Sequence, residues 1–412
     1  MKTMHFAERL YPQAKLENLL CEIRPARGVI DLSIGEPNVP LNHEILSHIP
    51  DGFEALARYP KESLQQTLLE TIRDWLCKRY SLDTSSIDVQ AQITVLAGSR
   101  EGIFMMPIAL FNRELQQGLP ITVAMPDPGY PIYQASAENV GAKVCCITQA
   151  QIEQLEKLAL NERDTFSEWS DIDLMFVCSP NNPTGEVLTL QQWTCLIELA
   201  NKHQFILVAD ECYSEIYSEP FKPLGLLEAC KHIGNNNFEN CLAIHSLSKR
   251  SGLPGLRSGF VVGDAKLIKL IQGYRNYHGV SLSPIQLKGS EAAWADEQHV
   301  TTNRAIYQEK FDVFTKHLGE CSAYQLPHGG FYIWLDVGGD SETFCQHLYQ
   351  NYGVKVLPGH YLAVSDKVKS EVRQYVRVAV VCHLGEVEQV ATAIKKSIAF
   401  FSHSNVVGDH VA

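Results

Sequence analysis

The sequence lacks several features that would place it in a special class of protein. It has no run of about 18 apolar residues, which is the length that a membrane-spanning helix needs. Residues 1–20 contain no apolar core of the kind that a secretory signal carries. Internal repeats and low-complexity segments are also missing. We therefore expect a cytoplasmic globular protein that does not associate with a membrane.

Positive charge is scarce as well. The 412 residues include 35 Lys and Arg against 47 Asp and Glu, which gives a formal net charge of −12. Nucleic acids and anionic membranes bind basic surfaces, so the excess of acidic residues argues against both as partners. An anionic small molecule can still bind where arginines gather locally.

The 12 cysteines include no C-x-x-C pair, and their spacing resembles neither a disulfide framework nor a zinc knuckle. Cys178, Cys241 and Cys382 lie within apolar runs, which indicates buried reduced thiols. His43-Glu44 with His48 misses the H-E-x-x-H spacing of zinc hydrolases by one residue. No metal site is predicted.

Short apolar runs alternate with helix-like segments between residues 90 and 265. Several runs show no polar alternation, which is expected of strands covered on both faces. The pattern predicts an α/β/α sandwich, whose ligands bind where the strands end. The runs are Ile93–Ala97, Ile121–Met125, Lys143–Ile147, Leu174–Cys178, Ile206–Ala209, Leu242–His245 and Gly259–Val262.

The pattern changes after Pro284. A helical stretch over Gln286–Leu318 precedes Gly329-Gly330-Phe331-Tyr332-Ile333-Trp334 and a strand over Tyr375–Val380. We expect a smaller α+β domain over residues 285–412, packed on a large domain over residues 41–284. Residues 1–40 end in a loop containing Gly35 and Pro37, and we predict that they form an N-terminal arm crossing between the domains.

The most informative segment is Ser246-Leu247-Ser248-Lys249, which follows the apolar run Cys241–Ile244 and precedes Arg257 by eight residues. A lysine amine at a strand end is suited to forming a Schiff base with a carbonyl cofactor, and an arginine beside it can clamp a phosphate. Taken alone, a lysine after a strand is more often solvated. The S-x-x-K spacing also occurs in serine β-lactamases, but the chain has no S-D-N or K-T-G motif to complete it.

Polar residues follow two further apolar runs. Asp210 ends the run Phe205–Ala209, where a carboxylate is poorly solvated and favours a cationic partner such as a protonated pyridine nitrogen. Tyr213, three residues later, is placed to donate its hydroxyl to a phenolic oxygen of the same ring. Asn182 lies in Asn181-Asn182-Pro183-Thr184-Gly185 and can reach that oxygen too. The alternatives are a helix cap for Asp210 and an ordinary turn for the Asn-Pro segment.

Gly98-Ser99-Arg100 opens a helix-like stretch after Ile93–Ala97, and the free N–H groups at a helix start form an anion site. An ordinary serine cap fits this segment equally well. A phosphate needs more cover than one helix start provides, and Ser246, Ser248 and Arg257 would supply it.

Two residues remain. Tyr130, in Pro128-Gly129-Tyr130-Pro131, can stack on the face of a pyridine ring, whereas we expect Tyr133 to pack in the core. Arg377 lies within the strand-like run Tyr375–Val380, where a bidentate grip on a carboxylate is the physical reason for an arginine.

In chain order, the motifs Gly-Ser, P-x-Y, N-P-T-G, D-x-x-Y, S-x-S-K with its arginine, and R-V-A extend over most of Leu32–Val380. Together they resemble the class I aminotransferases, which are fold-type I enzymes that use pyridoxal 5′-phosphate. By this resemblance Lys249, Asp210 and Tyr213 are the catalytic residues. Further cofactor contacts are implied for Gly98, Ser99, Arg100, Tyr130, Asn182, Ser246, Ser248 and Arg257, and contacts with the substrate carboxylate for Gly35, Asn182 and Arg377.

The resemblance also implies an assembly. Tyr59, in Ala57-Arg58-Tyr59-Pro60, resembles the tyrosine that reaches the cofactor phosphate of the neighbouring subunit. A homodimer with shared active sites is therefore expected.

Longer stretches such as Asp210–Glu215, His245–Ser251 and Leu253–Phe260 resemble the succinyldiaminopimelate aminotransferases. The expected substrates are N-succinyl-LL-2,6-diaminopimelate and 2-oxoglutarate, in lysine and diaminopimelate biosynthesis. The distal carboxylates of the first need local cations, for which Arg275, Arg58 and Lys61 are candidates.

Other functions remain open at this point. They are transamination of acetylornithine, aspartate, alanine or an aromatic amino acid, cleavage of a carbon–sulfur bond by a β-lyase of the same fold, and ligand sensing by a regulator that retains the cofactor fold.

Overall fold

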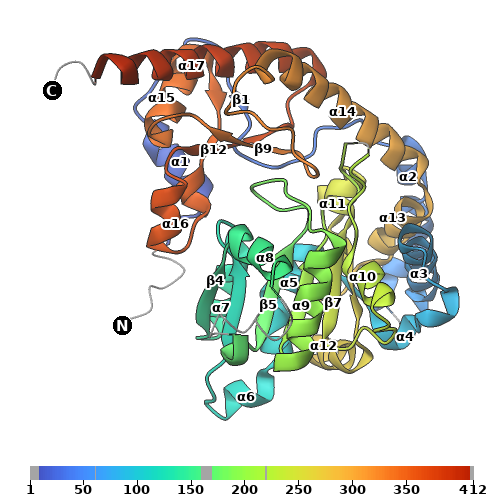
Figure 1. Ribbon diagram of the computed structural model, residues 1–412. Coiled ribbons are helices and arrows are strands. Elements are labelled where there is room, and N and C mark those ends of the chain that lie inside the picture. Colours follow the sequence, from blue (N-terminus) through green and yellow to red (C-terminus); the bar gives the residue numbers. More distant parts are fainter. Residues whose placement is uncertain (1–8, 61, 159–168, 219, 409–412) are drawn as a thin grey trace.

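A seven-stranded sheet forms the centre of the computed structural model, which describes residues 9–60, 62–158, 169–218 and 220–408 (Figure 1). The strands lie in the order β2-β8-β7-β6-β5-β3-β4, and β8 alone runs antiparallel to its neighbours. Each predicted run coincides with one strand to within one residue at either end. The strands are β2 (Ile93–Leu96), β3 (Thr122–Pro126), β4 (Lys143–Ile147), β5 (Leu174–Cys178), β6 (Ile206–Asp210), β7 (Cys241–Ser246) and β8 (Gly259–Gly263).

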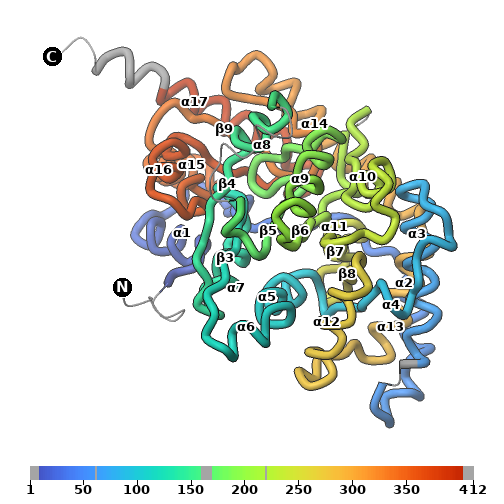
Figure 2. Tube along the Cα trace, turned by 60° about the horizontal axis from the view of Figure 1, so that its bottom comes forward, coloured from blue at the N-terminus to red at the C-terminus, as the bar shows by residue number. Residues whose placement is uncertain are grey.

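Helices cover both faces of this sheet. Figure 2 shows α8, α9 and α10 on one side of the row of strands and α5 and α12 on the other. Successive residues of a strand therefore enter different cores: Phe176 and Val208 belong to one apolar cluster, and Met175 and Leu207 to the other. This double burial explains why the runs show no polar alternation, and it confirms the α/β/α sandwich.

A second, three-stranded antiparallel sheet lies in the C-terminal part, in the order β11-β12-β9. Its strands are β9 (Tyr332–Asp336), β11 (Leu357–Pro358) and β12 (Tyr375–Ala379). The long helix α14 (Gln298–Leu318) packs against α17 (Val387–Gly408) above this sheet (Figure 1).

The predicted helical stretch Gln286–Leu318 is two helices rather than one. Helix α13 (Pro284–Ala295) ends at Asp296, whose backbone is extended. The Asp296 carboxylate accepts hydrogen bonds from the backbone N–H groups of Gln298 and His299, at 2.7 and 3.3 Å, and so caps α14. An aspartate within an otherwise helical pattern therefore separates the two helices.

The N-terminal segment is attached to the smaller sheet. Helix α1 (Pro12–Leu20) contacts α15 and β11, and β1 (Ile30–Asp31) pairs in parallel with β10 (Val354–Lys355). The carbonyl of Leu32 then accepts a hydrogen bond from the N–H of Ala379 at 2.9 Å. Residues 33–39 continue from there towards the large sheet.

The remaining elements connect these parts, and none of the described helices has both the length and the apolar character that a bilayer crossing requires. The helices are α2 (His43–Ser47), α3 (Gln66–Tyr80), α4 (Val89–Gln92), α5 (Ser99–Leu110), α6 (Asn112–Gln116), α7 (Pro131–Asn139), α8 (Gln149–Glu156), α9 (Leu190–His203), α10 (Leu226–His232), α11 (Leu247–Arg250), α12 (Ala265–His278), α15 (Ser341–Tyr352) and α16 (Asp366–Glu371). Short 3-10 turns are η2 (Ile49–Gly52), η3 (Glu54–Ala57), η4 (Glu62–Leu64), η5 (Thr84–Ser86), η7 (Trp169–Asp171), η8 (Pro254–Leu256), η9 (Gly359–Leu362) and η10 (Leu384–Glu386).

Candidate active site

A cavity of about 510 Å³ lies at the edge where the parallel strands β5, β6 and β7 end. Because β8 is antiparallel, its first residue, Gly259, pairs with Ser246 at the same edge and brings Arg257 there. The cavity is lined by Tyr11, Pro12, Gln13, Ile34, Gly35, Ser99, Arg100, Tyr130, Pro131, Cys178, Asn182, Asp210, Cys212, Tyr213, Ser246, Ser248, Lys249, Pro254, Arg257, Tyr332, Leu362 and Arg377. Most of the predicted site residues are in this set.

Lys249 enters the cavity from the short helix α11, which follows β7 directly. Its Nζ donates a hydrogen bond to the carbonyl of Gly35. Burial disfavours the charged amine and lowers the pKa of Lys249 to about 8. The nearby positive charges of Arg377 and Arg100 act in the same direction. A lysine with this pKa has a substantial neutral fraction near pH 8, which is the form that can attack a carbonyl or accept a proton.

Asp210 is buried at the end of β6, and each of its oxygens accepts one hydrogen bond. Oδ1 accepts from the backbone N–H of Cys212 at 3.2 Å, and Oδ2 accepts from the hydroxyl of Tyr133 at 2.8 Å. Burial raises the pKa of Asp210 above its usual value. A bound cation would hold the carboxylate in its charged form.

Tyr133 therefore has a polar partner that the sequence did not predict. The residue is buried, as expected, and its ring stacks on Phe176 with centroids 5.1 Å apart. Its hydroxyl, however, donates a hydrogen bond to Asp210. Tyr133 thus connects the carboxylate to the first turn of α7, where Tyr130 meets its ring edge-on at 5.7 Å.

Arg377 and Asn182 lie together on the opposite wall. The Nη1 of Arg377 donates to Asn182 Oδ1 at 2.8 Å, and its Nη2 donates to the carbonyl of Ser33 at 2.7 Å. Nε of Arg377 is buried and has no hydrogen-bond partner among the described residues. Tyr213 and Tyr332 approach each other beside this arginine, with hydroxyls 3.1 Å apart.

A third group forms a cradle for an anion. Helix α5 begins after Gly98, whose φ is +84° and which offers no side-chain cap, so the first N–H groups of the helix remain open. The positive φ of Gly98 disfavours any other residue, and a Cβ there would also displace the guanidinium of Arg257. Ser246 and Ser248 add hydroxyls on the other side, with their Oγ atoms 3.0 Å apart.

Arg100 lies apart from this cradle. Its Nε donates to the hydroxyl of Tyr130 at 2.8 Å, and its guanidinium carbon is 5.9 Å from the centre of the Tyr130 ring. Within the described residues Arg100 forms no ion pair. Its charge is therefore available to a ligand in the cavity.

Several predicted residues, Gly98 among them, are not in the set that lines the cavity of their own chain. Tyr59 follows η3 and is 94% exposed, and Arg275 forms an ion pair with Glu101 and donates to the carbonyl of Val280. Arg58 is exposed, and Lys61 lies outside the described residues.

Several lining residues were not predicted from the sequence, among them Tyr11, Gln13, Cys212 and Tyr332. Tyr332 follows Gly329-Gly330-Phe331, and paired glycines are a local turn signal but indicate no ligand. No local pattern distinguishes Tyr11 or Gln13, because they reach the cavity only through the path of the N-terminal segment.

The residues present fit pyridoxal 5′-phosphate. The cradle at Gly98 and Arg257 suits the phosphate, Asp210 suits the ring nitrogen, and the uncommitted Nε of Arg377 suits a substrate carboxylate. Lys249 lies among these three groups with its amine in the cavity. When bound, the cofactor supplies a pyridinium ring that withdraws electrons from a bond to the substrate Cα.

The lowered pKa of Lys249 is testable. In the cofactor-free protein, labelling of Lys249 by an amine-selective acylating reagent should rise with pH to a midpoint near 8. Free Nα-acetyl-lysine, with a pKa of about 10.4, provides the reference. Labelling is followed by mass spectrometry of the peptide that contains Lys249. A midpoint that matches the free amine would show that burial does not act on this lysine.

Comparison with known proteins agrees with the geometry. Residues 27–394 match the family model for aminotransferase class I and II. LL-diaminopimelate aminotransferase of Maridesulfovibrio salexigens is 28% identical over 376 residues, which is 87% of this chain and 92% of the relative. LL-diaminopimelate aminotransferase of Dehalococcoides mccartyi is 29% identical over 349 residues, or 80% and 83% of the two chains.

Solved structures give the same result. An aminotransferase of Neisseria meningitidis has a TM-score of 0.83 at 36% identity and covers 94% of this chain and 97% of its own. A probable N-succinyldiaminopimelate aminotransferase of Thermus thermophilus shares the fold at a TM-score of 0.78 and 22% identity, over 94% and 100% of the two chains. Since the family match extends over most of the sequence, the protein belongs to the class I and II aminotransferases, which depend on pyridoxal 5′-phosphate.

Proposed function

We propose that this aminotransferase moves an amino group from N-succinyl-LL-2,6-diaminopimelate to 2-oxoglutarate, in lysine and diaminopimelate biosynthesis. The supporting observation is the charge of the cavity. Arg100, Lys249, Arg257 and Arg377 line it, and Asp210 is the one carboxylate among the described lining residues. In a chain with net charge −12, such a local excess of cations favours a ligand with several anionic groups.

The chain's own residues divide the work at the reacting end. Arg377, held by Asn182, binds the α-carboxylate and orients the amino acid. The neutral amine of Lys249 accepts the proton from Cα and returns one to the new position. Asp210, held by Tyr133, would keep the ring nitrogen of the bound cofactor protonated, and the hydroxyl of Tyr213 would donate to the phenolic oxygen of the ring.

The distal end of the substrate carries two more carboxylates. Arg100 is the best-placed cation for one of them, because it lines the cavity and forms no ion pair among the described residues. The exposed ring of Tyr11 lies at the same cavity. Arg275 is a weaker candidate, because its charge is already paired with Glu101.

LL-2,6-Diaminopimelate itself is the second candidate substrate. The support is that the two relatives at 28% and 29% identity are both named LL-diaminopimelate aminotransferase. It differs from the first candidate by lacking the succinyl group, so the two can be compared directly.

The proposal is tested by the relative kcat/KM for a panel of amino donors with 2-oxoglutarate. N-succinyl-LL-2,6-diaminopimelate should be used fastest, ahead of LL-2,6-diaminopimelate, acetylornithine, aspartate, alanine and aromatic amino acids. If another donor has a higher kcat/KM, the substrate assignment is wrong and that donor takes its place. Release of pyruvate and ammonia from cystathionine without an oxo acid would instead indicate a carbon–sulfur lyase.

Replacement of Arg100 tests the distal contact. Arg100→Gln should lower kcat/KM for the succinylated substrate by roughly 10- to 100-fold, because it removes one charge-assisted hydrogen bond, and should leave the half-reaction with the shorter glutamate nearly unchanged. Arg275→Gln is the matched control, since that arginine pairs with Glu101. If Arg275→Gln shows the selective loss and Arg100→Gln does not, the distal contact belongs to Arg275.

The role of Asp210 gives a further prediction. Asp210→Asn should lower kcat by roughly 10²- to 10⁴-fold, because an amide cannot hold a positive charge on the ring nitrogen. Asp210→Glu keeps the carboxylate and should be much milder. Steady-state rates and the cofactor content of both variants are the measurements. Equal damage from the two substitutions would assign Asp210 a packing role.

We also propose that the protein is a homodimer with shared active sites. The support is the resemblance of Tyr59 to a tyrosine that contacts the neighbouring cofactor, together with its 94% exposure in the single chain. Phe53 and Leu56, on the same short segment, are 54% and 52% exposed, and exposed apolar groups of this kind are typical of contact surfaces.

Subunit mixing tests the shared site. Tyr59→Phe subunits mixed with Lys249→Ala subunits should regain activity above either parent, because one site of each heterodimer then has both natural residues. Activity is measured after mixing, and native mass spectrometry shows the fraction of heterodimer. Heterodimers without any regained activity would place Tyr59 in the site of its own subunit.

A further inference from the structure

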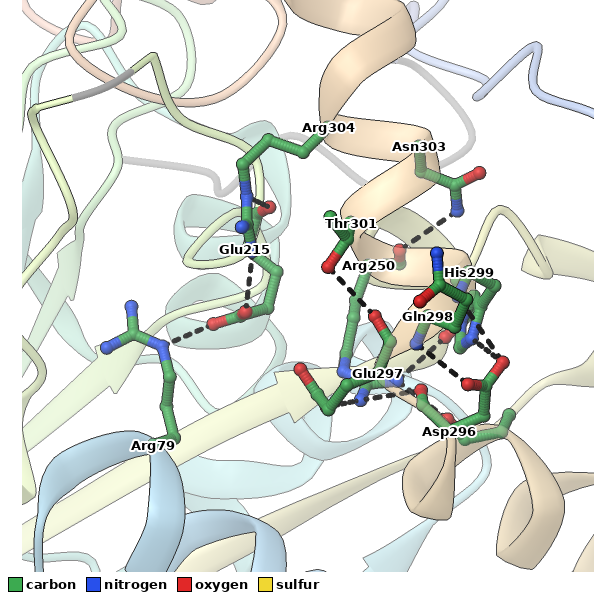
Figure 3. A network of polar contacts seen from close by, with 12 residues as sticks. Arg79, Glu215, Arg250, Asp296, Glu297, Gln298, His299, Thr301, Asn303 and Arg304 are labelled. Atoms are coloured by element: carbon green, nitrogen blue, oxygen red, sulfur yellow. Dashed lines mark hydrogen bonds and ion pairs between the residues drawn. The ribbon is translucent and has the colours of Figure 1, made fainter.

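The residue that follows Lys249 is a fully enclosed arginine. Arg250 is 2% exposed, and its guanidinium lies beside two tryptophans that contact each other, 5.4 Å from the centre of the Trp75 ring and 4.7 Å from that of Trp294. Nη1 donates to the carbonyl of Ala293 at 2.7 Å, and Nη2 forms an ion pair with Glu297. Figure 3 shows this arginine reaching the junction between α13 and α14.

A buried charge of this kind is not needed for stability alone. Removing an ion from water is costly, and an apolar side chain of similar size often stabilises a buried position at least as well. The arginine instead constrains geometry, because its planar guanidinium can make all of these contacts in only one orientation of the side chain. Arg250 therefore fixes the backbone at its own position relative to the junction of α13 and α14.

That backbone belongs to the helix that carries Lys249. Helix α11 has only four residues, Leu247–Arg250, so it has little rigidity of its own. At its start, Ser246 Oγ accepts from the N–H of Ser248 at 3.1 Å. At its end, the carbonyl of Arg250 accepts from the side-chain amide of Asn303 on α14 at 3.3 Å. Lys249 is the residue between these two attachments.

Helix α14 also holds the backbone in front of Lys249. Two turns beyond Asn303, the buried Lys310 donates from Nζ to the carbonyl of Asn38 at 3.2 Å. Asn38 lies three residues after Gly35, whose carbonyl meets the Lys249 amine. One helix thus contacts the segments on both sides of the lysine.

We propose that Arg250 is a positioning residue for Lys249: through Glu297 and Ala293 its side chain fixes α11 to the junction of α13 and α14, so that the lysine amine enters the cavity. The inference rests on the assignment of Lys249 as the cofactor lysine, which is part of the proposed function.

The test measures capture of the cofactor by the cofactor-free protein. Pyridoxal 5′-phosphate is added to the wild type and to Arg250→Met, captured complex is reduced with borohydride, and the Lys249 peptide is quantified against time. Arg250→Met should slow capture by roughly 10- to 100-fold, as expected when a reacting group is displaced. The induced circular dichroism of the bound cofactor should also change, because it depends on how the ring is held.

Arg304→Met is the matched control. Arg304 also attaches α14 to the large domain, by donating to Glu215 Oε2 at 3.3 Å, but it does not touch α11 (Figure 3). The melting temperatures of both variants are measured to show that each is folded, and the control should capture cofactor at the wild-type rate. Glu297→Gln should slow capture in the same sense as Arg250→Met.

The outcomes separate the two assignments. Wild-type capture and an unchanged dichroism signal in folded Arg250→Met would overturn the positioning role. Absence of label on Lys249 in the wild type would instead overturn the assignment of the cofactor lysine. If Arg250→Met and Arg304→Met slow cofactor capture equally, the slowing reflects a general loss of stability, and the proposal is overturned as well.

Discussion

The structure depends on one electrostatic constraint: a carboxylate is kept at the end of a buried strand within a cavity lined by four cations. Asp210 is satisfied by Tyr133 and by the N–H of Cys212, while Arg100, Arg257 and Arg377 take positions around it with Lys249. Asp210 and Arg377 are buried, and a buried charge is costly unless it has partners. Their arrangement is stable because backbone carbonyls, hydroxyls and amides accept or donate at each one, and because anionic ligands complete it.

Successive residues at the end of β6 face opposite sides of the sheet and therefore lie in different environments. Asp210 points into the cavity, whereas the next residue, Glu211, points behind the sheet, where it accepts from the hydroxyl of Tyr80 at 2.5 Å and from the N–H of Leu226 at 2.7 Å. Burial raises the pKa of Glu211 to about 7. The end of β6 is therefore held by hydrogen bonds on both faces of the sheet.

The sequence was sufficient for the sheet and for the residues at strand ends, because apolar runs covered on both faces leave a strong local signal and parallel strands end at one edge. It was insufficient where a contact joins distant segments. Nothing near Tyr133 indicates that its hydroxyl meets Asp210, and nothing near Tyr11 indicates that it reaches the cavity. Arg275 is a candidate ligand by its charge, and nothing near it in the sequence indicates that it pairs with Glu101 of a different helix.

The same limit applies to the segment between the two sheets. Residues 33–39 lie between the two sheets, and three cations donate to their carbonyls: Arg377 to Ser33, Lys249 to Gly35 and Lys310 to Asn38. Each cation comes from a different element, namely β12, α11 and α14. Because backbone carbonyls accept hydrogen bonds whatever the side chain, the amino-acid sequence of this segment carries no record of these contacts. Gly35 is the exception, since a Cβ there would collide with the hydroxyl of Tyr332. The close packing around that glycine brings the amine of Lys249 and the hydroxyl of Tyr332 to the same residue of the segment.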